Sequence, residues 1–309
     1  MPKATLEQWR MLRAVVEHGG FAQAAAVVHK SQSTIHHAVH KLEDLLGVQL
    51  LEVEGRKAKL TPAGETLLRR SHLLLSQAQQ LEELARSLAA GVEPVIRLAV
   101  DVIYPHEKLY DMLARFSEAY PQTRIELFEV VLSGGEEMLQ SGKADLVVSH
   151  FLPPDKMGTP VAQVEFIPVV SRTHPLASAP QPLPAAELAR YRQVVMRDSG
   201  LTRKRDSGWL GAEQRWTVTH LSTSLYIVKR GLAFARLPRS WIQAELDSGE
   251  LVPLRLEEGG NTLITLYLAY ANRDTAGPAT RFLGQLIRDA AGTAPDAIAP
   301  HAEKDNHAD

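Results

Sequence analysis

A long segment without glycine or proline, from Glu65 to Ala90, constrains this chain more than any other feature. Thr61 is a suitable N-cap, Pro62 suits the first helical position, and Gly91 suits a helix end. The segment therefore predicts one helix over residues 62–91, about 40 Å long at ~1.5 Å per residue. Because a chain of 309 residues is too long for one ordinary core, this helix is expected to separate two domains.

Leucines recur every seven residues along the predicted helix, at Leu67, Leu74, Leu81 and Leu88. Ser71, Ala78 and Ala85 take the alternate positions of the same seam. This heptad pattern is typical of a helix that packs closely against another helix. We expect the stripe to pair with a second copy of the chain, in a dimer or a tetramer. The alternative is that it packs on the C-terminal domain of its own chain.

The first sixty residues carry the signals of short helices followed by two short strands. Thr5 and Gln8 have the spacing of a capping box at the start of one helix. The alanine-rich segment FAQAAAVV predicts a second helix, and Ser31 and Gly47 are suitable caps for a third. Two strand-like runs in VQLLEVEGRKAKL then predict a basic hairpin. This order describes a helix-turn-helix followed by a wing.

The third predicted helix carries three histidines within five positions. Its apolar stripe consists of Ile35, Val39, Leu42 and Leu46. That stripe leaves His36, His37 and His40 facing outward. The spacing of His36 and His40 can bind zinc, but no third ligand is evident, and no nucleophile accompanies them. DNA contact and a solvated surface without a role stay open, and we expect DNA contact.

In a helix-turn-helix the second helix of the motif enters the major groove with its N-terminal end first. Base-edge contacts are then expected from the polar side chains at the start of the third predicted helix, and phosphate contacts from the wing. The predicted partner is double-stranded DNA in a promoter or operator. The predicted DNA-contacting residues are Ser31, Gln32, Ser33, Thr34, His36, His37, His40, Arg56 and Lys57.

Strand-like and helix-like segments alternate beyond the long helix. VIRLAV, RIELFEVV and DLVVSH are apolar runs typical of strands, and amphipathic segments lie between them. The β-α-β-α-β order predicts a parallel sheet with helices on its faces. A second unit of the same kind follows, with the chain crossing between the units near Val164–Val170 and returning near Leu263–Tyr270. The sequence therefore predicts two α/β lobes.

The N-terminal segment resembles the winged helix-turn-helix of LysR-type transcriptional regulators. The resemblance rests on Ala24-Ala25, Ser31-Gln32, Lys41-Leu42-Glu43, Leu46-Gly47-Val48, Leu50 and Leu60-Thr61-Pro62-Ala63-Gly64. Where Gly20 stands the family usually has serine, and where His36 and His37 stand it has serine and arginine. Where Leu51 and Val53 stand it has phenylalanine and arginine. These departures concern the DNA sequence preference rather than the fold.

The C-terminal region is similar to the two-lobed, periplasmic-binding-protein-like α/β effector domain of the same family, through the segments YPQTRIELFE, SGKADLVV, THPLA, GLAFARLP and ELDSGELVPL. The resemblance implies a transcriptional regulator that binds DNA as an oligomer and responds to a small-molecule effector. The expected organisation is a winged helix-turn-helix at 1–61, a linker and dimerisation helix at 62–91, and an effector-binding domain at 92–291 with lobe I at 92–163 and 270–291 and lobe II at 164–269.

A ligand of such a domain is expected between the lobes, at the carboxyl ends of the strands. Helix N-termini and hydroxyl groups there suit an anionic group, so we expect an organic acid, with an aromatic or apolar body. Each serine or threonine could instead be an ordinary helix N-cap. The candidate effector-binding residues are Asp101, Tyr104, Ser149, His150, Ser199, Gly200, Leu201, Thr202, His220 and Ser222.

Several classes of function are disfavoured by what the sequence lacks. Without cysteine there are no disulfides, thiolates or zinc–sulfur sites. The sequence has no dinucleotide-binding G-x-G-x-x-G, P-loop or H-E-x-x-H, so neither enzyme activity nor a cofactor or metal is predicted. With no signal peptide and no membrane-spanning run, a cytoplasmic protein is expected. A DNA-binding oligomer without a ligand is the alternative function, and residues 292–309 are predicted to be disordered.

Overall fold

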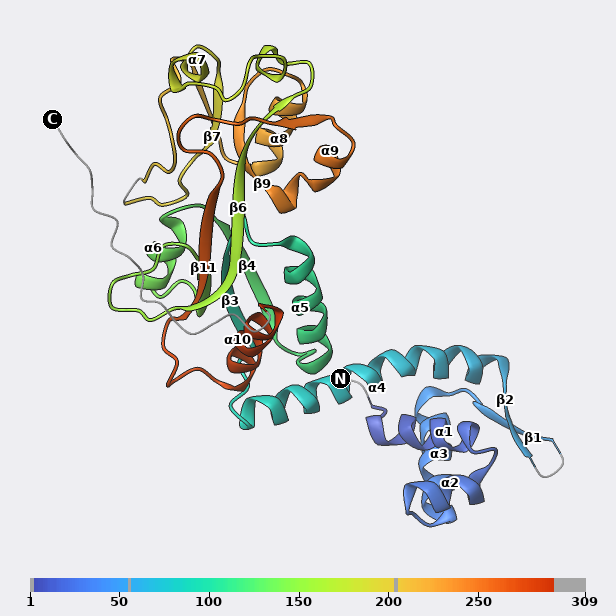
Figure 1. The fold of residues 1–309 in the computed structure, drawn as a ribbon. Coiled ribbons are helices and arrows are strands. Elements are labelled where there is room, and N and C mark those ends of the chain that lie inside the picture. The colour runs from blue at the N-terminus through green and yellow to red at the C-terminus, as the bar shows by residue number, and fades with distance from the viewer. Residues whose placement is uncertain (1–2, 55–56, 203–204, 292–309) are drawn as a thin grey trace. The chain divides into compact units, whose positions relative to one another are not determined.

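The computed structural model describes residues 3–54, 57–202 and 205–291 (Figure 1). The chain divides into two compact units between Ala90 and Gly91, and each unit is described by itself. The tail 292–309, for which disorder is predicted, lies outside the described residues. Within the described part of the chain, no helix is long and apolar enough to cross a membrane.

The N-terminal unit is a winged helix-turn-helix followed by a long helix, as the sequence predicts (Figure 1). The capping box forms, since Gln8 N donates to Thr5 Oγ1 at 3.3 Å and Thr5 N donates to Gln8 Oε1 at 2.8 Å. Ser31 Oγ accepts from Thr34 N at 3.1 Å, and Gly47 ends the same helix with φ +69°. The elements are α1 (Leu6–Glu17), α2 (Phe21–Val28), α3 (Gln32–Leu46), β1 (Leu51–Glu54), β2 (Lys57–Leu60) and α4 (Pro62–Ala89).

The core of this unit is formed where the apolar stripes of α1 and α3 pack together. Its fully buried side chains include Leu12, Val15, Ile35, Val39, Leu42 and Leu50. The prediction that Leu46 completes the stripe is wrong, because its side chain is 38% exposed. Glu43 is buried instead, and its Oε1 accepts from Leu50 N at 2.8 Å and from Leu51 N at 3.1 Å. These bonds satisfy two amides where the chain enters β1, which offsets the cost of burying a carboxylate.

The first half of α4 packs against this core. Its buried residues are Gly64, Leu68, Ser71 and Leu75. A Cβ at Gly64 would lie 2.1 Å from the Leu50 carbonyl oxygen, so only glycine allows the helix to approach this closely. The prediction that Ser71 belongs to the exposed heptad seam is wrong. It shares the buried face with Leu68 and Leu75, and its Oγ donates to Leu68 O at 2.8 Å.

The C-terminal unit is built on a seven-stranded mixed sheet in the order β10-β6-β11-β5-β3-β4, with β9 also paired to β6. The predicted parallel arrangement holds for β3, which pairs in parallel with β4 and β5. The strands of this sheet are β3 (Val95–Asp101), β4 (Arg124–Val130), β5 (Leu146–Ser149), β6 (Thr159–Ser171), β9 (Ala235–Pro238), β10 (Leu251–Pro253) and β11 (Thr262–Tyr270). A separate parallel pair is formed by β7 (Gln193–Met196) and β8 (Arg215–Val218).

The prediction of a parallel sheet in each lobe is wrong for the strands that join the lobes. The long strand β6 runs antiparallel to β11, with Phe166 opposite Thr262 and Thr159 opposite Leu268. The later part of β6 pairs with β9 and β10, also antiparallel. One sheet therefore passes through both lobes. An apolar run predicts a buried strand but not its direction, which explains the error.

Helices cover both faces of the sheet in lobe I. One face packs against α5 and α10 through residues such as Leu98, Phe116 and Leu283. The other face, with Ala99 and Val147, packs against α6, and Figure 1 shows α5 and α6 on opposite sides of the sheet. The helices of the unit are α5 (His106–Ala119), α6 (Gly134–Gln140), α7 (Ala185–Ala189), α8 (Leu221–Lys229), α9 (Gln243–Asp247) and α10 (Pro278–Ala290), with 3-10 turns η1 (Pro175–Ala177) and η2 (Arg239–Trp241).

Candidate DNA-binding and effector-binding sites

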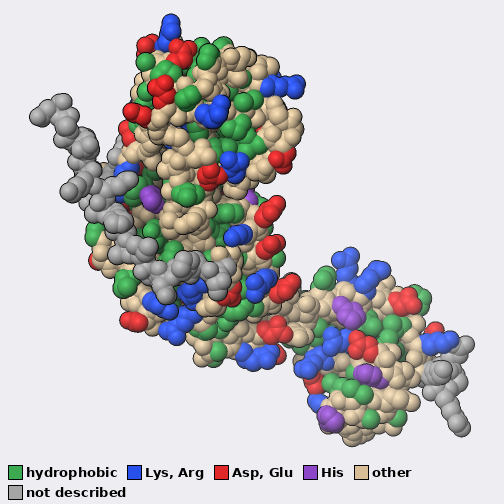
Figure 2. Space-filling model, in the orientation of Figure 1, with side chains coloured by type: hydrophobic (Ala, Val, Ile, Leu, Met, Phe, Trp, Pro, Cys, Tyr) green, Lys and Arg blue, Asp and Glu red, His purple; other side chains and the backbone are tan. Residues whose placement is uncertain are grey.

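The N-terminal end of α3 presents polar side chains to solvent. A hollow of about 560 Å³ is lined by Gln32, Ser33, His36, His37 and His40. Ser31 and Thr34 act in the helix cap, where Ser31 Oγ lies 2.7 Å from Thr34 Oγ1 and 2.9 Å from Ser33 Oγ. The opposite face of α3 is buried in the core, so the polar face at the start of the helix is the one that can contact a partner. Figure 2 shows histidine side chains on the surface of this unit.

Two of the histidines are held in a hydrogen-bonded chain. His40 Nδ1 lies 2.9 Å from Glu43 Oε2, and His40 Nε2 lies 3.2 Å from His36 Nε2. The ring of Phe21 on α2 lies 5.0 Å from the His36 ring, measured between centroids. His36 and His40 are therefore oriented by neighbouring side chains, although both are exposed.

The wing is the antiparallel hairpin of β1 and β2, with Leu51 opposite Leu60 and Glu54 opposite Lys57. Arg56 lies outside the described residues, and so does the side chain of Lys57. The phosphate contacts predicted for Arg56 and Lys57 therefore stay predictions.

The predicted dimerisation stripe on α4 is largely exposed within its own unit. Leu74, Leu81 and Leu88 are 51%, 67% and 49% exposed, while Leu67 packs partly against the core. An exposed row of large apolar side chains is unfavourable in water and is typical of a surface that takes part in an interaction.

Strand ends of lobe I bring two predicted effector-binding residues together. Asp101 ends β3 and Ser149 ends β5, and the parallel register sets Val100 opposite Val148. Side chains alternate along a strand, so Asp101 and Ser149 both lie on the face that α6 covers. Ser149 Oγ is fully buried and has no hydrogen-bond partner among the described residues.

Burial changes the acidity of Asp101. Its carboxyl group accepts from Ile103 N at 3.2 Å, and burial, with a smaller contribution from the charge of Asp198, raises its pKa to about 7. A buried carboxyl group with a pKa near neutrality is a common feature of functional sites. Tyr104 follows it, but its ring belongs to the core on the side of α5 and α10. Burial raises the pKa of Tyr104 to about 12, and its hydroxyl has no partner among the described residues.

A segment of lobe II, residues 198–202, crosses to lobe I and is called here the cross-lobe segment. Asp198 accepts from Ser133 N at 3.1 Å and from Ser133 Oγ at 2.7 Å. Ser199 Oγ accepts from Val131 N at 2.8 Å and donates to Val131 O at 3.1 Å. These bonds connect the two lobes directly beside the strand ends.

Further contacts extend the same connection. Thr202 Oγ1 donates to Glu137 Oε1 at 2.8 Å, and the amides of Leu201 and Thr202 also donate to Glu137. Arg205 forms an ion pair with Glu136 at 2.9 Å and stacks over the Phe151 ring at 4.3 Å. The lobes are therefore joined by charge-assisted bonds as well as by the crossing strands.

Two glycines at the start of α6 permit this close contact. A Cβ at Gly134 would lie 2.0 Å from Ser199 Oγ, and a Cβ at Gly135 would lie 2.9 Å from the Ser149 Cβ. Glycine is needed at both positions because α6 approaches one lobe's strand end and the other lobe's cross-lobe segment at once.

The two compact units match two family models. Residues 6–65 match the model described as bacterial regulatory helix-turn-helix protein, lysR family, and residues 89–292 match the LysR substrate binding domain. The chain belongs to the LysR family of transcriptional regulators. It is therefore a DNA-binding regulator with a substrate-binding domain for a small-molecule effector, and members of this family associate with themselves.

Named relatives agree with this assignment. The chain is 31% identical over 283 residues to the uncharacterized HTH-type transcriptional regulator YeeY of Escherichia coli, covering 90% of this chain and 91% of YeeY. It is 26% identical to the transcriptional regulator YhaJ of Escherichia coli O157:H7, with 89% and 93% covered. The full-length virulence activator AphB of Vibrio cholerae has a similar fold, with a TM-score of 0.51, 22% identity and 92% and 99% coverage.

The contact between the lobes brings together only part of the predicted effector-binding set. Asp101, Ser149, Ser199, Gly200 and Thr202 lie along the lobe contact. His150 Nδ1 donates to Thr265 O on β11 at 2.9 Å. Leu201 joins the contact only through its backbone amide, which donates to Glu137, and its side chain is exposed. Tyr104 lies in the core, and His220 and Ser222 are exposed at the start of α8.

Sequence reasoning missed Asp198, Ser133, Glu136, Glu137 and Arg205 as residues of this lobe contact. The available signal was Ser133-Gly134-Gly135, which by itself suggests only a turn before a helix. Two adjacent glycines after a strand also mark close backbone approach, and that interpretation is the one that the structure supports.

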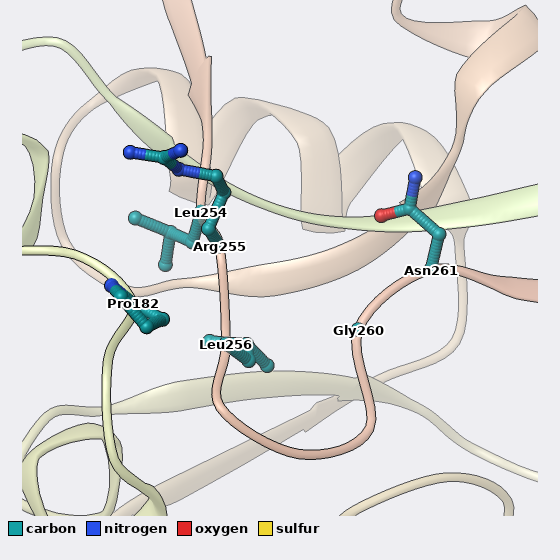
Figure 3. A pocket seen from close by; sticks show the side chains of 6 residues that line it. All are labelled: Pro182, Leu254, Arg255, Leu256, Gly260 and Asn261. Atoms are coloured by element: carbon teal, nitrogen blue, oxygen red, sulfur yellow. The ribbon is translucent and has the colours of Figure 1, made fainter.

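Lobe II of the regulator also has a hollow away from the lobe contact. It measures about 390 Å³ and is lined by Pro182, Leu254, Arg255, Leu256, Gly260 and Asn261 (Figure 3). None of the predicted effector-binding residues lines it. In Figure 3 these side chains come from three separate stretches of chain and do not converge polar groups on one point, so we assign no ligand to it.

Substitution of Asp101 tests the electrostatics of this site. The folded-state pKa of about 7 exceeds the ordinary 3.8, so Asp101 stabilises the fold at low pH and this stabilisation is lost as pH rises toward 7. Asp101→Asn cannot ionise and should flatten the pH dependence of the unfolding temperature over that range. Asp155→Asn, at an exposed position, is the matched control and should follow the wild-type curve. Parallel curves for wild type and Asp101→Asn would contradict the assignment.

Proposed function

We propose that this LysR-family regulator reads operator DNA with the N-terminal end of α3. The exposed row Gln32, His36 and His40 supports this, because it occupies the part of a helix-turn-helix that enters the major groove. Ser31 and Thr34 help to cap the helix and place its start. Arg56 and Lys57 on the wing would bind phosphates and set the orientation of the domain on the duplex.

Substitution in α3 and in the wing should have different effects on DNA binding. Gln32→Ala should lower the affinity for a selected operator by roughly 5- to 150-fold, the range of a good base contact, and leave random duplex unaffected. Lys57→Ala should weaken binding to both duplexes and reduce the salt slope by about 0.9. Fluorescence anisotropy with both duplexes measures this. An unchanged operator affinity for Gln32→Ala would refute the assignment of α3 as the reading helix.

We propose further that the stripe of Leu74, Leu81 and Leu88 is the self-association surface of the regulator. It is exposed in the N-terminal unit and continues past the point where α4 leaves the core at Leu75. Two copies of the helix would bury these side chains against each other and present two DNA-binding domains to one operator. Linked domains bind more tightly than separate ones, because the second contact becomes intramolecular.

Polar substitutions test the stripe. Leu74→Gln with Leu81→Gln should dissociate the oligomer, because each buried leucine contributes ~1.5–3 kcal/mol. Operator binding should weaken in parallel. Leu73→Gln is the matched control, since Leu73 is 64% exposed but lies one position off the stripe. Light scattering that shows the wild-type mass for the double variant would exclude this interface.

We also propose that the effector binds between the lobes, where Asp101 and Ser149 face α6. The supporting observation is a buried hydroxyl without a partner next to a buried carboxyl group of raised pKa, a combination that a ligand can satisfy. Ser199 and Thr202 already bond to Val131 and Glu137, so an effector that uses them must replace those bonds. A ligand that prefers one lobe orientation then shifts the equilibrium between orientations. We propose binding without catalysis.

A thermal-shift screen of the full-length regulator tests the effector site. The sequence-based expectation of an organic acid stays a prediction, so the panel contains carboxylic acids with aromatic and aliphatic bodies, together with amines and alcohols of similar size. The compound that stabilises the wild type should stabilise Asp101→Asn and Ser199→Ala less. Ser222→Ala should respond like wild type if the site is confined to the lobe contact. If no compound in the panel stabilises the protein, this result would favour a regulator without a ligand.

A further inference from the structure

The hydrogen-bonded chain from Glu43 through His40 to His36 fixes which ring nitrogens carry hydrogen. Glu43 accepts two backbone amides at Oε1 and faces His40 Nδ1 with Oε2 at 2.9 Å. A carboxylate only accepts, so His40 Nδ1 is the donor. In the neutral ring, His40 Nε2 then has only a lone pair.

The same reasoning continues to His36. Its Nε2 lies 3.2 Å from His40 Nε2, and because the latter has only a lone pair, His36 Nε2 must donate. A neutral imidazole carries one hydrogen, which leaves His36 Nδ1 as an acceptor. This nitrogen has no hydrogen-bond partner among the described residues, and His36 lines the exposed hollow at the start of α3. The neutral pair therefore offers an acceptor to an outside partner.

One added proton reverses this property. A proton from water binds His36 Nδ1, which is the ring nitrogen of the pair without a hydrogen bond. The bridging hydrogen can then move from His36 Nε2 to His40 Nε2, which places the positive charge beside the Glu43 carboxylate. Whether or not the bridging hydrogen moves, His36 Nδ1 now carries hydrogen and is a donor.

The surroundings of the pair contain few other groups that could replace this effect. Helix α2 contributes the Phe21 ring and has no titratable side chain. The charged groups of α1 are engaged elsewhere, in the ion pairs Arg10–Glu7, Lys30–Glu7 and Arg13–Glu17. On α3 itself the exposed neighbours are His37, Lys41 and Asp44.

We propose that the His36–His40 pair, oriented by Glu43, reads one operator base differently in its two protonation states. As an acceptor, His36 Nδ1 selects the amino group of adenine or cytosine in the major groove. As a donor, it can no longer bind these amino groups and favours guanine or thymine, whose O6 and O4 are acceptors at the corresponding place in the groove. The DNA sequence preference of the regulator then depends on pH. This inference rests on the proposed function, in which the start of α3 enters the groove.

A simple charge effect makes a different prediction. Protonated histidines that bind phosphate would tighten binding to every sequence, because the phosphate contact is independent of sequence. The proposed switch changes the ranking of bases at one position instead. The two mechanisms are therefore separated by sequence preference rather than by affinity alone.

The test is a selection with the full-length regulator from a pool of random duplex DNA. It is carried out at about pH 8 and about pH 5.5, which span the range where histidine side chains change charge. At one position of each half-site, on the strand that His36 reads, the preferred base should be adenine or cytosine at the higher pH and guanine or thymine at the lower pH. Anisotropy with two duplexes that differ at this position should show the ratio of Kd values changing at least roughly fivefold.

Three variants separate the parts of the switch. His36→Ala should lose discrimination at this position at both pH values. His40→Ala should lose it mainly at about pH 8, because a lone neutral His36 can take either tautomer. His37→Ala, an exposed neighbour outside the hydrogen-bonded chain, is the matched control and should keep the switch. Random-duplex affinity and circular dichroism verify that each variant is folded.

Two outcomes would overturn the inference. One is an operator with the same base preference at both pH values, including the case where all sequences bind more tightly at low pH. The other is a switch that survives His36→Ala. A selection that recovers no preferred sequence at either pH would instead refute the proposed reading function of α3, and this inference with it.

Discussion

The antiparallel pairing of β6 with β11 is the constraint on which the C-terminal domain depends. These two strands belong to both lobes, so the lobes share one hydrogen-bonded sheet instead of a flexible linker. Relative motion of the lobes must then bend or twist this pair of strands. The contacts of the cross-lobe segment lie after β4, at the other edge of the sheet from β6 and β11 in lobe I. A ligand bound there can act on the lobe orientation with few contacts.

In the N-terminal unit a buried carboxylate connects the core of the fold with the exposed face of α3. One oxygen of Glu43 satisfies the amides that begin the wing, and the other orients His40 on the outer face of α3. The same side chain thus joins the helix, the hairpin and the histidine pair. A buried carboxylate is costly unless its oxygens are hydrogen-bonded, and both oxygens of Glu43 face N–H groups. The start of the wing and the orientation of His40 therefore depend on the same side chain.

Much of the fold could be predicted from the sequence because its signals are local. Caps at Thr5, Ser31 and Thr61 and the stop at Gly47 set the helix boundaries of the N-terminal unit, and all four act as predicted. The β-α-β order predicted the parallel strands β3, β4 and β5, but the antiparallel direction of the strands that join the lobes could not be predicted, since an apolar run fits either direction. Periodicity places Leu46 in the buried stripe, because it does not reveal that the neighbouring carboxylate of Glu43 is needed for two amides.

The candidate sites were predictable to different degrees. The outward face of α3 follows from its buried stripe, so the polar residues there could be identified without a structure. Only some of the predicted effector-binding residues lie at the lobe contact. A strand end indicates where a site can lie, but it does not indicate which loop of the other lobe reaches that place. Asp198 and Arg205 come from such a loop, far from Ser133 and Glu136 in sequence. Their side-chain partners are set by tertiary contacts that no short-range pattern encodes.

Gly134 allows the two lobes to approach each other closely at their contact. Gly134 has no Cβ, so its backbone can lie directly against Ser199 Oγ. A Cβ at this position would lie 2.0 Å from that oxygen. The lobe arrangement described here is thus available only to a chain with glycine at this point. Any larger residue would hold these two surfaces of the lobes apart. The residue at this one position therefore sets how closely the two lobes can approach each other.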